Sequence, residues 1–99
     1  MSETGTPYLR LTDRPQRGLD VRRRRIGDEV ALIADYRNLF LDDRADAVWK
    51  ACDGRRCVAD IAEHLAAVEG MTVGDALAAT LAAIITFRER SLLDLEPGD

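Results

Sequence analysis

The residues able to perform chemistry are few in this sequence of 99 amino acids. Two cysteines, Cys52 and Cys57, lie five positions apart, and His64 is the one histidine. A zinc site needs four ligands, which two thiols and one imidazole do not complete, and no signal peptide indicates an oxidising compartment, so we expect free thiols. Catalytic Ser-His-Asp arrangements, glycine-rich phosphate loops and metal-ligand spacings are also missing from the sequence. We therefore predict a protein that is not an enzyme and that uses no cofactor or metal.

The charge of the chain argues against nucleic acid as a partner. There are 14 Lys and Arg residues against 18 Asp and Glu residues, so the formal net charge is −4, and the protein as a whole repels polyanions. No apolar run approaches the roughly 18 residues of a membrane-spanning helix. We therefore expect a cytoplasmic protein that binds neither nucleic acid nor a membrane.

Four consecutive arginines, Arg22 to Arg25, are the most conspicuous charged run. Successive side chains of a strand point to opposite faces, so at most two of the four can share a surface. The run is therefore typical of a charged strand that resists aggregation, and a polyanion site is the alternative.

The remaining reactive or aromatic residues fit structural roles. We expect His64 to be a half-exposed surface residue and Trp49 to lie in the core. Cys52 has the spacing of a small core residue, and Cys57 is expected near the N-cap of a helix.

The first half of the chain is predicted to form strands after a flexible arm at residues 1–16, which contains Gly5, Pro7 and Pro15 without a sustained period. The folded domain is expected over 17–95, with a polar tail at 96–99. The expected strands are Leu19–Ile26, Glu29–Ala34 and Asn38–Leu41, with turns at Gly27-Asp28 and Asp35-Tyr36-Arg37.

Helical spacing follows in the second half of the chain. The first helix is capped by Asp42 or Asp43, carries Ala45, Val48, Trp49 and Cys52 on one face, and ends at Asp53-Gly54. The second carries Val58, Ile61, Ala62, Leu65 and Val68 on one face and ends at Gly70. The third opens with Thr72 and Asp75 as a capping box, runs to about Arg90, and faces the core with Leu77, Leu81, Ile84 and Phe87 or Arg88. Three strands followed by three helices predict an α+β domain with the helices on one face of an antiparallel sheet, a layout that resembles a winged helix-turn-helix.

The third helix is apolar around more of its circumference than one buried face requires. Ala78, Ala82 and Ile85 form a second apolar line beside its core face. If Asn38–Leu41 is the edge of the sheet, an extended peptide could add there as a further strand, with its side chains against this helix. Packing on the first two helices and a homodimer contact explain the same line equally well.

A resemblance to the PqqD family is carried by particular motifs of this sequence. They are Asn38-Leu39-Phe40-Leu41-Asp42, Ala45, Val48-Trp49, the run Cys52-Asp53-Gly54-Arg55-Arg56-Cys57-Val58, Ile61-Ala62, and Arg88-Glu89-Arg90-Ser91-Leu92-Leu93. The similarity covers roughly Leu19 to Leu95. Members of that family are peptide chaperones of pyrroloquinoline quinone biosynthesis and, more widely, recognition elements for ribosomally made, post-translationally modified peptides.

This resemblance implies a winged-helix-like fold that binds no DNA and holds the leader of a precursor peptide as an added β-strand. The backbone of the leader would form hydrogen bonds with Asn38, Leu39, Phe40 and Leu41. Its apolar side chains would pack on Ala78, Ala82 and Ile85. Its acidic residues could pair with Arg37 and Arg88. The implied partner is a modifying enzyme, either a radical S-adenosylmethionine maturase or a leader peptidase of the lasso-peptide type.

Two other functions remain as alternatives to leader binding. A winged-helix DNA-binding regulator would use Arg22 to Arg25 with Arg55 and Arg56, although the net charge and the Ala-Ile face of the third helix oppose it. An enzyme subunit would use the apolar helix face as a permanent interface.

Overall fold

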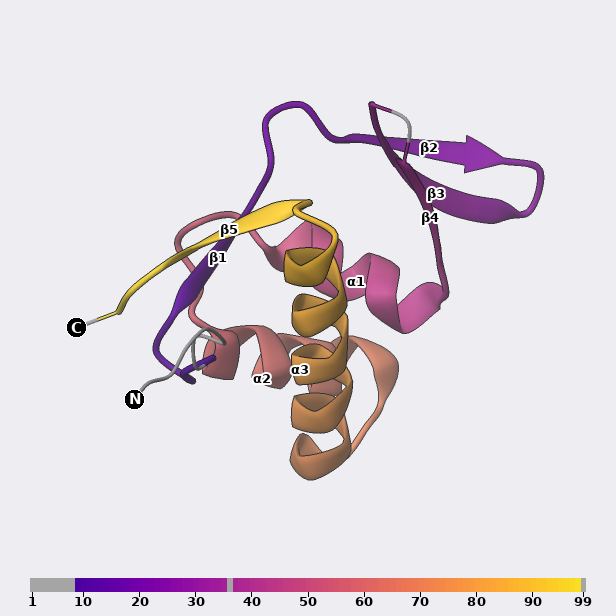
Figure 1. The fold of residues 1–99 in the computed structure, drawn as a ribbon. Coiled ribbons are helices and arrows are strands. Elements are labelled where there is room, and N and C mark those ends of the chain that lie inside the picture. Colours follow the sequence, from indigo (N-terminus) through magenta and orange to yellow (C-terminus); the bar gives the residue numbers. More distant parts are fainter. Residues whose placement is uncertain (1–8, 36, 99) are drawn as a thin grey trace.

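The computed structural model describes residues 9–35 and 37–98, and places two small sheets beside a group of three helices (Figure 1). The elements are β1 (Arg14–Arg17), β2 (Arg22–Ile26), β3 (Glu29–Ala34), β4 (Arg37–Leu41), α1 (Asp43–Ala51), α2 (Val58–Glu69), α3 (Val73–Glu89) and β5 (Leu93–Glu96). One antiparallel sheet has the order β2-β3-β4, and the other pairs β1 with β5. The predicted α+β order of three strands followed by three helices is confirmed, and the β1–β5 pair adds to it.

The three-stranded sheet is built from two tight turns and one clear apolar alternation. Gly27, with φ +64°, closes the β2–β3 hairpin where Ile26 faces Glu29. Along β3, Val30, Leu32 and Ala34 enter the core, as expected for one face of a pleated strand. The first strand is shorter than predicted, because the chain before Arg22 forms a loop in which the Leu19 side chain is 99% exposed.

Each helix begins at a cap that is visible in the sequence. The Asp42 carboxylate accepts the Ala45 N–H at 2.8 Å, and the Thr72 hydroxyl accepts the Asp75 N–H at 3.1 Å. Cys57 is the N-cap of α2, as predicted, and Gly70 ends that helix with φ +66°. Within the described residues no single helix is long and apolar enough to span a membrane, and α2 and α3 reach that composition only together, across a 118° bend.

The expectation of a flexible arm over residues 1–16 is wrong for residues 9–16, which the structure describes. The carbonyl of Asp13 accepts a hydrogen bond from the Val58 N–H at 2.9 Å, and that of Leu11 accepts one from the Ala59 N–H at 3.0 Å. This segment therefore supplies acceptors for N–H groups in the first turn of α2, which have no partner within the helix. Strand β1 then pairs with β5 over 14–17 and 93–96, which moves the domain limits beyond 17–95 at both ends. These partners are far away in sequence, so local composition did not reveal them; residues 1–8 lie outside the described part of the chain.

The core lies between the three helices and the inner face of the β2-β3-β4 sheet. Trp49 is buried, as predicted, and its ring meets that of Phe87 edge to face with centroids 5.2 Å apart. Ile84 and Phe87 are buried on the core face of α3, as predicted, but Ala76 and Thr80 join them in place of Leu77 and Leu81. Leu77 and Leu81 are only half-buried, and Val68, which was expected in the core face of α2, is exposed. The apolar surface of α3 is too broad for its sequence alone to locate the buried side.

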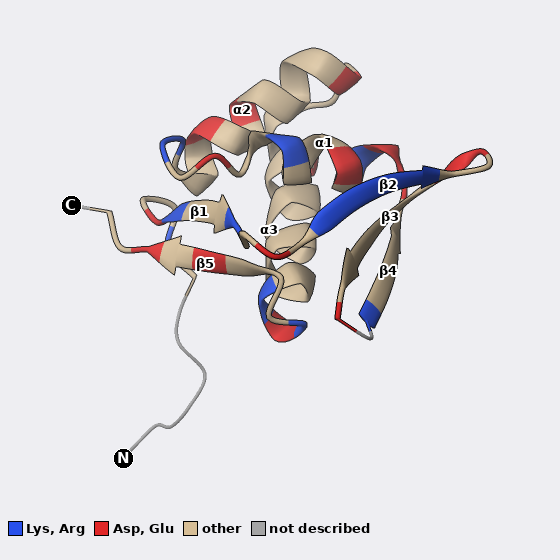
Figure 2. Cartoon of the chain, turned by 90° about the horizontal axis from the view of Figure 1, so that it is seen from above, with Lys and Arg blue, Asp and Glu red and all other residues tan. Residues whose placement is uncertain are grey.

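One bidentate ion pair ties strand β2 to helix α1. The Arg23 guanidinium donates from Nε and Nη2 to the two Asp46 carboxylate oxygens, at 2.7 and 2.8 Å. Lys50 approaches the same carboxylate at 3.6 Å. The hydrogen bonds from Arg23 hold the pKa of Asp46 below its ordinary value. Figure 2 shows β2 as a stretch of basic residues along the sheet edge.

Asp46→Asn is expected to lower the free energy of unfolding by about 1 kcal/mol at neutral pH, because it removes the charge that Arg23 binds. Since the pKa of Asp46 is lowered by folding, this stabilisation is complete above the ordinary pKa of about 3.9 and disappears as the pH falls through the folded-state value. Urea unfolding at pH 7 and at about pH 2 measures the change. Asp43→Asn, in the same helix without a described ion pair, is the control; equal losses in both variants would contradict the prediction.

Candidate functional site

Strand β4 is an edge of the three-stranded sheet. It pairs with β3 from Arg37 to Leu41, and within the described residues no other strand pairs with its second edge. The terminal strand β5, which could have filled this position, pairs with β1 instead. Every second N–H and C=O of an edge strand points outward, so β4 presents backbone groups that an extended chain can bond.

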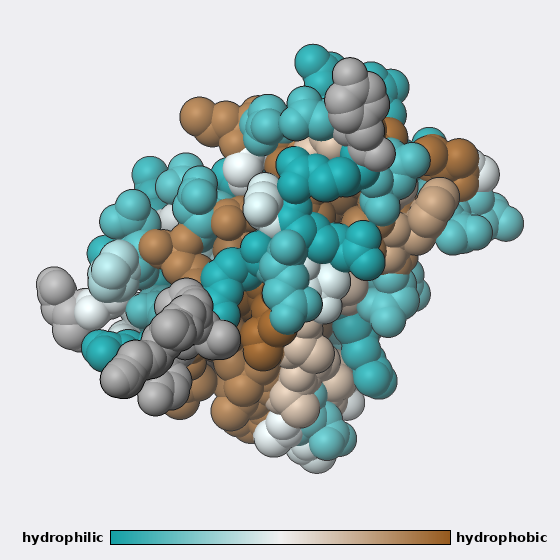
Figure 3. All heavy atoms as spheres, viewed as in Figure 1, coloured by the Kyte–Doolittle hydropathy of each residue, from teal (hydrophilic) through white to brown (hydrophobic). Residues whose placement is uncertain are grey.

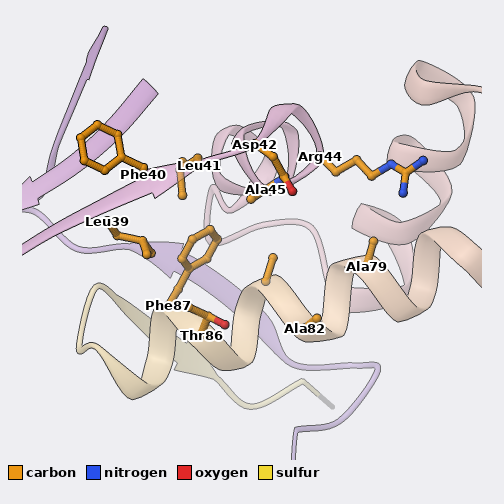
Figure 4. Close-up of a pocket in the computed structure, with 11 residues that line it drawn as sticks. Leu39, Phe40, Leu41, Asp42, Arg44, Ala45, Ala79, Ala82, Thr86 and Phe87 are labelled. Carbon is orange, nitrogen blue, oxygen red and sulfur yellow. The ribbon is translucent and has the colours of Figure 1, made fainter. Parts of the chain in front are cut away.

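The side chains of β4 alternate between a groove and the opposite face of the sheet. Leu39 and Leu41 point toward α3, whereas Phe40 points away from it and is 54% exposed (Figure 4). Leu41 is buried against the core, and Leu39 packs on it while remaining half-buried. The strand therefore offers an apolar wall to whatever lies between it and α3.

Helix α3 forms the opposite wall with small side chains. A groove of about 320 Å³ lies between β4 and α3, and its lining from the helix is Ala79, Ala82, Ala83, Thr86 and Phe87. Phe87 is buried and closes the base of the groove, and the three alanines leave room above it. Hydrophobic residues also gather over α3 on the molecular surface (Figure 3). The volume lies at the lower end of the range for binding pockets, as suits a few side chains rather than a whole cofactor.

Polar groups fix both ends of β4. At its start, the Arg37 guanidinium donates to the Arg90 carbonyl at 2.6 Å, which ties the strand to the C-terminal end of α3. At its end, Asp42 and Arg44 line the groove from the start of α1. The Asp42 carboxylate is already engaged as the helix cap. The groove is thus held open between fixed ends, with an apolar centre.

The comparisons with known proteins give one match, and it is to a protein of similar fold. No protein-family model matches the chain, and no curated protein matches its sequence significantly. Among solved structures, the chain is similar to the PqqD truncation of Methylobacterium extorquens PqqCD, with a TM-score of 0.69 and 29% sequence identity over 81% of this chain and 87% of that chain. The solution NMR structure of that truncation represents a functional, stand-alone recognition element for ribosomally synthesised and post-translationally modified peptides. The chain is PqqD-like. The resemblance predicted from its motifs is confirmed.

The groove of this PqqD-like chain brings together only part of the predicted site. Leu39, Leu41 and Ala82 line it, and Phe40 borders it although the Phe40 side chain points away from α3. The other predicted residues lie outside its lining: Arg37 bonds Arg90, Asn38 is exposed on β4, Arg88 is half-buried, and Ala78 and Ile85 are exposed on the flank of α3. Ile85 is 39% exposed, so it is not sealed in the core.

Sequence reasoning missed the alanines that face the strand. Ala79, Ala83 and Thr86 have the spacing i, i+4, i+7, which is also the spacing of Ala78, Ala82 and Ile85 one position earlier. Both lines are apolar or small, so the hydrophobic pattern of α3 cannot decide which of them faces β4. The register of α3 against the sheet decides it, through the burial of Ile84 and Phe87.

The reactive groups lie away from this groove. Burial raises the pKa of the Cys52 thiol to about 12, and its Sγ donates to the Val48 carbonyl at 3.1 Å. Cys57 is partly exposed at the start of α2, and His64 is exposed. Within 9–35 and 37–98, no three His, Cys, Asp or Glu side chains are grouped closely enough to hold a metal ion. The Cys52 thiol is therefore neutral at physiological pH and acts as a core side chain.

We expect the two thiols to react at very different rates. Native protein treated with a thiol-specific disulfide reagent at pH 8 should release about one equivalent quickly, from Cys57, and the second only after unfolding, because Cys52 is buried and protonated. Cys57→Ser should abolish the fast phase, and Cys52→Ala should leave it unchanged. Two fast equivalents in the native protein would contradict the assignment.

Proposed function

We propose that this chain binds the leader region of a ribosomally synthesised precursor peptide as an added β-strand on β4 and delivers it to a modifying enzyme. The observation that carries the proposal is the edge of β4, with which no second described strand pairs, beside an apolar groove of about 320 Å³. The chain would perform no chemistry itself. It would raise the effective concentration of the substrate at its partner.

Backbone hydrogen bonds would supply the sequence-tolerant part of the affinity. A strand added to β4 satisfies the outward N–H and C=O groups of Arg37–Leu41, which otherwise bond water. Because both strands exchange solvent bonds for mutual ones, each bond contributes only about 0.5–1.5 kcal/mol. This part fixes the direction and register of the guest and leaves its selection to side chains.

Side-chain burial would supply the selection. Every second guest residue would point into the groove, between Leu39 and Leu41 on one side and the alanines of α3 on the other. The small alanines leave space for large apolar guest side chains, each worth about 1.5–3 kcal/mol when fully buried. Ala82 keeps its predicted role, and we assign Ala79 and Ala83 the role expected earlier of Ala78 and Ile85. Arg37 is engaged with Arg90, so we propose Arg44 as the cation nearer the bound peptide.

The partner enzyme is proposed from the family resemblance. A radical S-adenosylmethionine maturase is the first choice and a leader peptidase of the lasso-peptide type is the second, with both proteins in the cytoplasm. The similarity to a PqqD recognition element supports this function over a DNA-binding regulator, and the net charge of −4 opposes the regulator independently.

The proposal requires a short open reading frame near this chain's gene, and the direct test uses the peptide that such a frame encodes. Fluorescence anisotropy of its labelled N-terminal half, titrated with the full chain, should show saturable binding that changes little between low and physiological salt. Binding of duplex DNA in preference to the peptide, with a steep salt dependence, would overturn the proposal.

Ala82→Glu is expected to raise the Kd of the leader at least ~30-fold, because it places an unpaired carboxylate against buried apolar side chains. Ala78→Glu is the matched control: it makes the same change on an exposed alanine one turn earlier that does not line the groove. It should change the Kd less than about 3-fold. Circular dichroism would verify that both variants keep their helices. Equal losses of affinity would remove the groove from the binding site.

N-methylation of successive leader amides should reveal the added strand. Only alternate N–H groups of a strand face its neighbour, so methylation at every second position should raise the Kd about 10-fold or more, with smaller changes between. Isothermal titration calorimetry with a set of singly methylated peptides measures the profile. A profile without a two-residue period would show that the leader binds in another conformation.

A further inference from the structure

The sheet has a second face that the proposed function leaves unused. The register of β2, β3 and β4 places one set of side chains on the side opposite the groove: Arg22, Arg24, Ile26, Glu29, Ala31, Ile33, Asn38 and Phe40. The helices pack on the other side, where Val30, Leu32 and Leu41 join the core. Figure 1 shows the sheet extending away from the helices, so none of the described helices covers this outer face.

The outer face combines exposed apolar side chains with two arginines, Arg22 and Arg24, against one carboxylate, that of Glu29. Phe40 is 54% exposed and Ile26 is 50% exposed, whereas Ala31 is buried between its cross-strand neighbours Arg24 and Phe40. Arg23 points to the other side and is paired with Asp46, but no ion pair with a described residue engages Arg22 or Arg24. The chain has a net charge of −4, so without its four consecutive arginines it would carry −8. Positive charge is thus concentrated on one strand of an acidic protein.

We propose that this outer face docks an acidic, partly aromatic surface of a second protein, namely the enzyme that receives the peptide. This inference rests on the proposed function. A second copy of the chain fits poorly, because its own outer face carries the same arginines and like charges would oppose each other. Nucleic acid fits poorly because Phe40 and Ile26 are exposed on the same face as the arginines, and because the rest of the chain repels phosphate.

The position of the face suits delivery. The outer face and the groove share β4, with Phe40 on one side of the strand and Leu39 on the other. Neighbouring strands lie about 4.8 Å apart, so Arg24 on β2 is roughly 10 Å from the edge strand that would receive the guest. A protein docked on the outer face would therefore lie beside the bound peptide without covering the groove.

A labelled random copolymer of Glu and Tyr serves as the probe for such a surface. Anisotropy titrations at about 0.15 M salt should show that it binds the native chain more tightly than poly-Glu of the same length, because Tyr can pack on Phe40 and Ile26. Arg22→Glu/Arg24→Glu should raise the Kd about 10-fold or more. Arg55→Glu/Arg90→Glu, which changes the net charge equally at exposed positions off this face, should raise it less than about 3-fold. Amide shifts in NMR spectra should change mainly in β2 and β4.

The outcomes separate this inference from the proposed function. The Arg22→Glu/Arg24→Glu variant should keep its affinity for the leader peptide within about 2-fold, because its substitutions lie off the groove. Ala82→Glu should lose the leader and keep the copolymer. Equal weakening by both charge-reversed variants, or tighter binding of a duplex DNA of about 20 bp than of the copolymer, would overturn the docking surface. Binding of the copolymer by a native chain that does not bind the leader would overturn the proposed function and, with it, the identity of the docked enzyme, while the outer face would remain a site for an acidic, partly aromatic protein.

Discussion

The edge of β4 that no described strand pairs with is the constraint on which the arrangement of this protein depends. A short sheet normally protects its edge by charge, curvature or a covering element. Here β2 protects its own edge with four arginines, whereas β4 has Asn38 and Phe40 exposed and no described strand beside it. Strand β5, near the C-terminus, pairs with β1 in a separate sheet. The terminal segments thus complete the fold elsewhere and leave one edge available.

An open edge is useful only if the wall opposite it stays in place. The β2-β3-β4 sheet extends from the helices and touches them mainly through its inner face, so a few contacts set its position. The Arg37 contact with the Arg90 carbonyl fixes the start of β4 against the end of α3, and the Arg23 pair with Asp46 fixes β2 against α1. Phe87 links the base of the groove to Trp49 in the core. These contacts keep the groove at a defined width before a guest arrives, which reduces the ordering that binding must supply.

The parts of the fold that depend on local chemistry were predictable. Gly27 marks the hairpin, and Asp42, Thr72 and Gly70 mark helix ends, because capping and turn geometry involve residues close in sequence. The β1–β5 sheet was missed, since Arg14–Arg17 is polar and its partner is almost eighty residues away. Only one wall of the candidate site was predictable, because the other wall depends on packing between distant elements. The β4 wall follows from strand alternation, but choosing Ala83 over Ile85 requires the packing of α3, and that helix is apolar on several sides.

The two faces of the sheet give the proposed peptide and enzyme sites a physical connection. A strand added to β4 would lengthen both faces: alternate side chains would fill the groove, and the others would continue the outer face beyond Phe40. An enzyme docked on the outer face could then contact guest side chains as well as Arg24. By thermodynamic linkage, any such contact that strengthens enzyme binding strengthens peptide binding by the same factor. Because β4 belongs to both faces, this coupling needs no conformational change in the helices, and it would favour transfer from a loaded chain over an empty one.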